Sequence, residues 1–199
     1  MFALPNALTI LRIVLVPVFA IAFVMPGEVA RLVAFGIFVI AGVSDWLDGF
    51  AARKLKAGSD FGRMLDPIAD KVLVAVALMM LVAEGKFRKE IPGTDESVFS
   101  LLRLIPALII LSREILVSGL REYLAELRVS VPVSTVAKWK TTLQLVAIGF
   151  LIVGPAGEHV LPGTVMIGLV LLWIAALLTL YTGWDYFRAG IHHIVDHGA

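Results

Sequence analysis

The sequence contains no cysteine and has few charged residues. The absence of Cys excludes a disulfide framework, a thiolate nucleophile and a thiolate metal site. Only 17% of the 199 residues are charged and 59% are hydrophobic, whereas soluble domains are typically about one quarter charged and about one half apolar. The composition therefore predicts an integral membrane protein. The formal net charge of +1 points to no charged partner, and we expect no nucleic-acid partner.

Six apolar segments are long enough to span a bilayer, which requires about 20 residues each. Turn-forming pairs such as Pro26-Gly27 and Pro162-Gly163 separate them. No basic region precedes the first segment, so we expect it to remain as a helix and not to be cleaved as a signal peptide. We predict a single all-α membrane domain over residues 1–199. Its six transmembrane helices are expected at 7–25, 32–51, 61–83, 101–120, 136–153 and 165–181.

Basic residues are unevenly distributed between the two sets of connections. One set, the poorer in basic residues, holds Arg31 and the basic cluster at 86–89. Because cytoplasmic segments of membrane proteins carry an excess of Lys and Arg, the bias places both termini on the cytoplasmic face of a membrane, expected to be the bacterial inner membrane. The richer set consists of Arg53, Lys54, Lys56, Arg63, Arg121, Arg128, Lys138, Lys140 and Arg188.

Four aspartates lie in one short segment, DWLDGFAARKLKAGSDFGRMLDPIAD, at 45–70. Carboxylates are costly at membrane depth, and where they occur there they usually face a cavity, pair with cations and mark a site. Residues spaced three or four apart share one face of a helix. One such stripe consists of Asp45, Asp48, Gly49, Ala52 and Arg53, and a second of Gly62, Asp66 and Asp70.

If the two stripes face each other, four carboxylates come together and require cations. Hard divalent ions with oxygen ligands suit this donor set, and Mg²⁺ or Mn²⁺ suits carboxylates that handle phosphates. The small residues on the same stripes leave room for a ligand. The alternative is a solvated loop between helices that happens to carry four carboxylates.

Cationic side chains inside the apolar helices form a second group. Arg12, Arg113, Lys138 and Lys140 lie in or at the start of predicted helices, where buried cations need anions. The planar guanidinium fork of Arg suits phosphate. We therefore predict that Arg113 and Lys138, together with Arg12 and Arg121, bind a substrate phosphate. Alternatively, Arg12 snorkels to the headgroups, Arg113 pairs with an acid such as Glu114, and the two lysines are interfacial anchors.

The pattern D-x2-D-G-x2-A-R-x8-G-x3-D-x3-D, met at every fixed position, resembles the signature of the CDP-alcohol phosphotransferase family. Three flanking segments, PNALTILRIVLVP, SREILVSGLREYLAE and KWKTTLQLVAIG, are similar to the branch of this family that uses glycerol 3-phosphate. The resemblance covers approximately residues 4–182.

This resemblance implies that a phosphatidyl group passes from CDP-diacylglycerol to sn-glycerol 3-phosphate, giving phosphatidylglycerophosphate and CMP. It implies that Asp70 is the general base and that Asp66 is also catalytic. It further implies two Mg²⁺ or Mn²⁺ ions on the four aspartates, and a homodimer of six-helix protomers, surrounded by membrane lipids, each with a polar cavity open to the cytoplasm. The CDP moiety is expected to be bound by Asp45, Asp48, Gly49, Ala52, Arg53 and Gly62.

Two alternatives remain open at this stage. The same chemistry could use another acceptor, such as inositol phosphate or serine, although free serine would not need both Arg113 and Lys138. A cation transporter could also hold intramembrane aspartates beside cations. Against a transporter, the acids cluster in one segment, and neither inverted repeats nor interrupted helices are evident.

Overall fold

The computed structural model describes residues 4–55, 60–84, 96–127 and 135–197. Within these ranges the secondary structure is helical, without a β-strand. The six long helices coincide with the six predicted apolar segments and extend beyond most of them, so the predicted all-α class is confirmed. The helices are α1 (Leu4–Val24), α2 (Glu28–Leu55), α3 (Asp60–Glu84), α4 (Glu96–Glu126), α5 (Thr135–Val153), the short α6 (Pro155–Glu158) and α7 (Thr164–His197).

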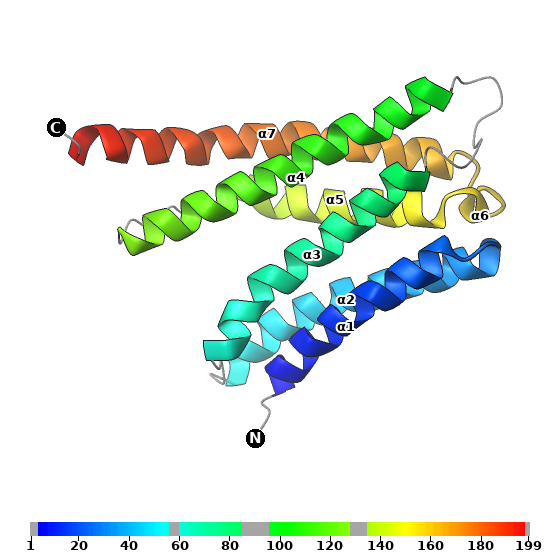
Figure 1. Ribbon diagram of the computed structural model, residues 1–199, viewed down its shortest axis with the longest axis horizontal. Coiled ribbons are helices and arrows are strands. Elements are labelled where there is room, and N and C mark those ends of the chain that lie inside the picture. The colour runs from blue at the N-terminus through cyan, green and yellow to red at the C-terminus, as the bar shows by residue number, and fades with distance from the viewer. Residues whose placement is uncertain (1–3, 56–59, 85–95, 128–134, 198–199) are drawn as a thin grey trace.

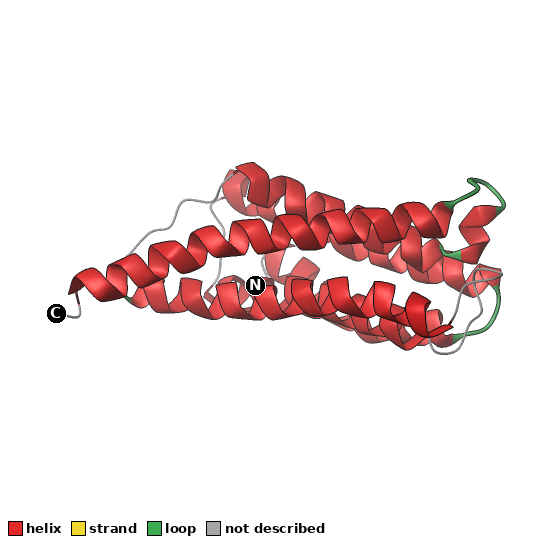
Figure 2. Cartoon of the chain, turned by 90° about the horizontal axis from the view of Figure 1, so that it is seen from above, coloured by secondary structure: helices red, strands yellow, loops and turns green. Residues whose placement is uncertain are grey.

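The long helices form an elongated bundle (Figures 1 and 2). Helix α7 packs along α5 and α4, while α1 packs along α2 and α3, and contacts between α2 and α5 join the two groups. Successive long helices run in opposite directions. The last turns of α2, α4 and α7 therefore lie at the same end of the bundle as the first turns of α1, α3 and α5, on the left in Figure 1.

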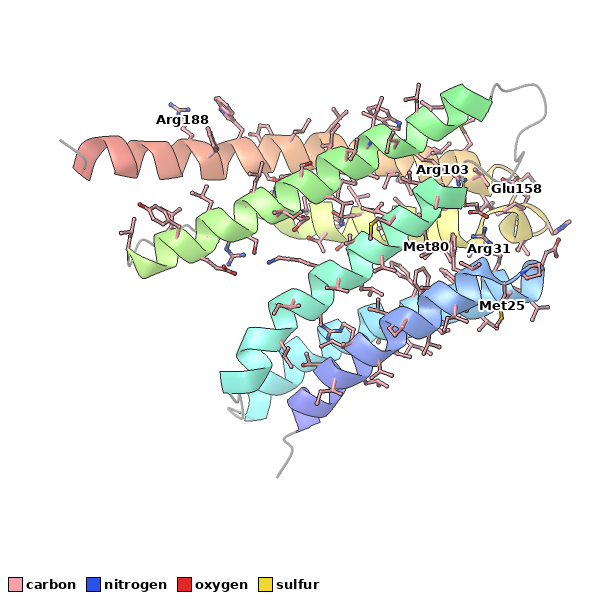
Figure 3. The ribbon with its side chains drawn as sticks, viewed as in Figure 1. Met25, Arg31, Met80, Arg103, Glu158 and Arg188 are labelled. Carbon is pink, nitrogen blue, oxygen red and sulfur yellow. The ribbon has the colours of Figure 1, made fainter. Side chains whose placement is uncertain are left out.

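The turns at the other end use glycine and a carboxylate cap. Gly27, with φ of 103°, reverses the chain between α1 and α2, and Gly163, with φ of 86°, precedes α7. Both angles fall in the left-handed region that glycine adopts without a steric penalty. The Glu158 carboxylate accepts hydrogen bonds from the backbone N–H of Gly163 at 2.6 Å and of Val165 at 3.0 Å. It therefore satisfies donors at the start of α7 (Figure 3).

The bundle is apolar on its outside and partly polar on its inside. Large apolar side chains such as Val14, Ile21 and Ile115 are exposed, whereas Arg12 and Arg103 are buried. This arrangement suits a protein surrounded by lipid. In the described part of the chain, Thr164–Trp184 is the one helical segment both long and apolar enough to cross a membrane on that basis alone. That all six long helices cross the membrane stays a prediction.

Candidate active site

The fold brings the two halves of the aspartate pattern to one end of the bundle. Asp45 and Asp48 lie in the last turns of α2, and Asp66 and Asp70 lie in the first turns of α3. The two helices are antiparallel neighbours that contact each other. The side chains of these four aspartates lie outside the described part of the structure, as do Gly49, Ala52, Arg53 and Gly62 beyond their helical backbone. The predicted metal and CDP contacts therefore remain predictions.

A four-carboxylate donor set on two adjacent helices fits divalent cations with oxygen ligands. Among the side chains that the structure describes, no other group of three or more His, Asp or Glu residues could hold a metal ion. The aspartate pattern is thus the candidate metal centre.

A polar cavity of about 300 Å³ lies between α3 and α4 at the same end of the bundle. Lys71, which follows Asp70 in the chain, lines it from α3, and its ammonium group donates a hydrogen bond to the hydroxyl of Ser118 on α4. Since Lys71 is the next residue after Asp70, the cavity lies beside the helix that carries half of the aspartate pattern. Its lining consists of Lys71, Arg113, Glu114, Val117, Ser118, Arg121 and Glu122.

Glu114 connects cations from two helices. Its Oε1 atom lies 3.5 Å from Nη1 of Arg113 and accepts a hydrogen bond from the ammonium group of Lys140 on α5. The Lys140 side chain is buried and that of Glu114 is 25% exposed, so their ion pair is partly shielded from water. Removing one partner of such a pair would leave an uncompensated buried charge. Glu114 therefore links α4 to α5 beside the cavity.

Arg113 is also fixed from α7. Its Nη2 atom donates a hydrogen bond of 3.1 Å to Oγ1 of Thr182. The next residue, Gly183, leaves space for the arginine, because a Cβ atom at that position would lie 3.0 Å from Cγ of Arg113. Contacts from α4 and α7 thus determine where the guanidinium lies.

An apolar groove runs between α2 and α5 and has a volume of about 640 Å³. It extends from Val160 and Leu161 at one end of the bundle to Gly42 and Val43, halfway along α2. Gly42 lies three residues before Asp45, so the groove leads along α2 toward the aspartate pattern. A chain of methylene groups could lie in it, since almost all of its lining is apolar.

Comparison with known proteins covers nearly the whole chain. Residues 2–181 match the model of the CDP-alcohol phosphatidyltransferase family. The chain belongs to this family. Relatives from Rickettsia bellii and Haemophilus influenzae are 45% identical over 186 residues and 40% identical over 198 residues, respectively. The alignments cover 94% of both chains for the first relative, and 98% of this chain and 97% of the relative for the second. Both relatives are named CDP-diacylglycerol–glycerol-3-phosphate 3-phosphatidyltransferase.

The family match confirms the resemblance carried by the aspartate pattern, and the structure places the predicted phosphate-binding residues as follows. Arg113 and Arg121 line the same cavity. Arg12 is buried in α1, which disagrees with the interpretation that its side chain snorkels to the membrane surface. It does not line that cavity. The backbone of Lys138 lies in α5, but its side chain is not among those described. Lys140 is buried against Glu114, and the interpretation of it as an interfacial anchor is wrong.

Sequence analysis did not single out Lys71 and Ser118, which line the cavity between α3 and α4. A signal for Lys71 was available, since an ionisable residue in a membrane helix is a functional candidate by default. Ser118 gave no such signal, because serine is common in membrane helices and its link to Lys71 spans 47 residues of sequence.

The other end of the bundle holds a buried ionic cluster. Arg31, at the start of α2, forms an ion pair with Glu84 at the end of α3, and Nη1 of Arg103 on α4 lies 3.7 Å from the same carboxylate. Sequence analysis assigned Arg31 to a loop, which is wrong, because α2 already begins at Glu28. The Arg31 guanidinium also lies 4.1 Å from the centre of the Phe23 ring. Figure 3 shows both arginines at the end of the bundle where Glu158 lies.

Proposed function

We propose that this protein transfers the phosphatidyl group of CDP-diacylglycerol to sn-glycerol 3-phosphate, forming phosphatidylglycerophosphate and releasing CMP. The observation that carries the proposal is the near full-length similarity to relatives named for this reaction, in a chain that holds every fixed position of the aspartate pattern. We further propose a homodimer in the bacterial inner membrane with its active site facing the cytoplasm.

The proposed reaction is a displacement at phosphorus. A hydroxyl oxygen of glycerol 3-phosphate attacks the phosphorus atom that carries the diacylglycerol group. The new P–O bond forms as the P–O bond to CMP breaks, and Asp70 accepts the hydroxyl proton. Asp66 acts with Asp70 in this step. Transfers of this kind depend mainly on positioning and on neutralising the charge of the phosphates.

Asp45, Asp48, Asp66 and Asp70 would hold two divalent cations, Mg²⁺ or Mn²⁺, which when bound supply charge neutralisation for the pyrophosphate and the departing CMP. Arg53 is proposed to bind a phosphate of the CDP moiety. Gly49, Ala52 and Gly62 have small side chains or none, and they would leave room for the nucleotide beside the carboxylates.

The cavity between α3 and α4 supports a phosphorylated acceptor. Arg113 and Arg121 line it, and Lys138 belongs to the first turn of α5, two residues before the buried Lys140. Arg113, Arg121 and Lys138 are proposed to attract and orient the phosphate of glycerol 3-phosphate, whereas Arg12, which does not line the cavity, would act on it only from a distance. An acceptor such as serine carries no phosphate group for these cations to bind.

The groove between α2 and α5 supports a lipid donor. It is lined almost wholly by apolar atoms and leads to within one turn of Asp45. An acyl chain of CDP-diacylglycerol in this groove would bring the donor's pyrophosphate to the end of α2, where the aspartates lie.

CMP release by the purified, detergent-solubilised protein tests the proposal. CDP-diacylglycerol and Mg²⁺ or Mn²⁺ would be supplied with glycerol 3-phosphate, inositol 1-phosphate or serine, and a parallel sample would contain EDTA. Release with glycerol 3-phosphate alone, abolished by EDTA, is the expected result. Release with another acceptor alone would overturn the acceptor assignment, and no release by folded protein with any acceptor would favour a transporter.

A further inference from the structure

The cations around the cavity between α3 and α4 differ in the groups that already neutralise their charge. Arg113 and Lys140 both approach Glu114, and Arg113 also donates to Thr182. Their positions are fixed and their charge is shared with a carboxylate. Glu114 therefore reduces the attraction that these two cations can exert on an incoming anion.

Lys71 lines the same cavity but has a different partner. Its ammonium group donates to the neutral hydroxyl of Ser118, and none of the carboxylates that the structure describes forms an ion pair with it. A lysine ammonium has three donor hydrogens, so two remain for a ligand after the bond to Ser118. Among the side chains that the structure describes, no carboxylate pairs with Lys71, which leaves its positive charge to attract an anion.

Lys71 lies close in sequence to the proposed general base and also lines the cavity proposed for the acceptor phosphate. It is the residue after Asp70, and adjacent Cα atoms are about 3.8 Å apart. Its side chain nevertheless lines the cavity shared with α4. An acceptor whose phosphate meets Lys71 is therefore held next to the helical turn that carries the proposed general base.

We propose that Lys71 is a specificity-determining residue that binds the phosphate of the phosphorylated acceptor, with Ser118 orienting its ammonium group. This inference rests on the proposed function, because it assumes a phosphorylated acceptor. Arg113, held by Glu114 and Thr182, forms the wall of the cavity on the α4 side and contributes a weaker, shared charge.

Steady-state kinetics on Lys71→Gln test this proposal. The lost charge-assisted contact is expected to raise the KM for glycerol 3-phosphate by about 10- to 100-fold. The KM for CDP-diacylglycerol is expected to change less than about twofold. Lys71→Arg keeps the charge and should recover most of the affinity, and Ser118→Ala should give a smaller rise of the same kind.

Arg188→Gln is the matched control, since Arg188 is exposed on α7 and points away from the bundle in Figure 3. It removes one positive charge near the same end of the molecule and should leave both KM values unchanged. An equal rise of both KM values in Lys71→Gln, or no rise in either, would overturn the proposal. So would a failure of Lys71→Arg to differ from Lys71→Gln.

Failure of this proposal can be distinguished from failure of the proposed function. The wild-type protein is first required to release CMP with glycerol 3-phosphate, and the Lys71 variants are compared only with that activity. Protection of the wild type against thermal unfolding by inorganic phosphate provides a second readout. Loss of this protection in Lys71→Gln but not in Arg188→Gln would support the assignment, and equal protection of both variants would contradict it.

Discussion

The two ends of the bundle both contain buried or partly buried charges, but they arrange them differently. At the end near Glu158, Arg31 and Arg103 converge on Glu84, and all three side chains are almost completely buried. At the other end, the charges of α3 and α4 border a cavity, and Lys71 meets only a hydroxyl among the described residues. In the first arrangement the charges neutralise one another, whereas the second leaves positive charge that can bind a ligand.

The difference shows how to separate stabilising charges from functional ones in this fold. Arg31 and Arg103 also donate to the backbone carbonyls of Ile152 and Leu81, at 3.4 and 3.2 Å, so they join α2, α4, α3 and α5. We expect substitutions at this end to change stability without changing substrate affinity. Substitutions at the cavity end should change turnover or substrate affinity.

The largest effect is expected for Asp70→Asn. The amide keeps the size of the side chain but removes a proposed metal ligand and the proposed proton acceptor, so kcat should fall by about 1,000-fold or more. Because four carboxylates repel one another without metal, the variant should be at least as stable as the wild type in EDTA. CMP release and thermal unfolding measure the two effects. An active Asp70→Asn enzyme would contradict the role of Asp70.

The second-largest effect is expected for Glu84→Gln, at the end of the bundle opposite the cavity. It should appear in stability alone. Glu84→Gln leaves Arg31 and Arg103 without their shared carboxylate, and such a loss costs about 3–5 kcal/mol for a buried ion pair. Thermal unfolding in detergent should show a clearly lower midpoint, while the KM values of the remaining folded enzyme stay unchanged.

Glu28→Gln is the control for this substitution. Glu28 lies at the same end and forms an ion pair with His159 at 3.0 Å, but both side chains are more than half exposed. Exposed pairs contribute little to stability, so no measurable shift is expected. Equal destabilisation by the two substitutions would mean that the buried cluster has no special structural role.

Helix positions and the aspartate stripes could be predicted from the sequence because both depend on spacing within one helix. The 3.6-residue period places Asp66 and Asp70 on one face whatever the neighbouring helices do. The role of Glu114 could not be predicted in the same way. Its contact with Lys140 depends on how α4 and α5 are rotated against each other, and no local pattern encodes that rotation.

The same reasoning explains the two errors on cations. Arg31 lies close to the Pro26-Gly27 turn, so a loop position was a natural expectation, but Gly27 completes the reversal and the helix resumes at once. Lys140 lies near a helix start, where lysines often reach the membrane surface. Glu114 on α4, which is distant in sequence, pairs with Lys140 and keeps its side chain buried.

A third, intermediate effect is expected for Gly183→Ala. The added methyl group would lie 3.0 Å from Cγ of Arg113, so the arginine has to shift from its present position. Overpacking of this kind typically costs about 1–3 kcal/mol, and we expect a KM for glycerol 3-phosphate raised by about 3- to 10-fold. Gly119→Ala, on α4 with no atom near the new methyl group, is the control. Similar kinetics in both variants would show that the position of Arg113 does not matter for the acceptor.

The smallest effect is expected in the apolar groove, where neither end's charges are involved. Gly42→Leu should fill part of the groove without a clash, because no atom lies within 4 Å of the position of its Cβ. The displaced part of an acyl chain would move into lipid that is as apolar as the groove, so the loss is mainly one of positioning. We expect a rise of about two- to fivefold in the KM for long-chain CDP-diacylglycerol, a smaller rise for a short-chain donor, and no change for glycerol 3-phosphate.

Gly36→Leu, on the same helix but outside the groove lining, should leave all three KM values unchanged. If it matched Gly42→Leu, the effect would belong to α2 as a whole and not to the groove.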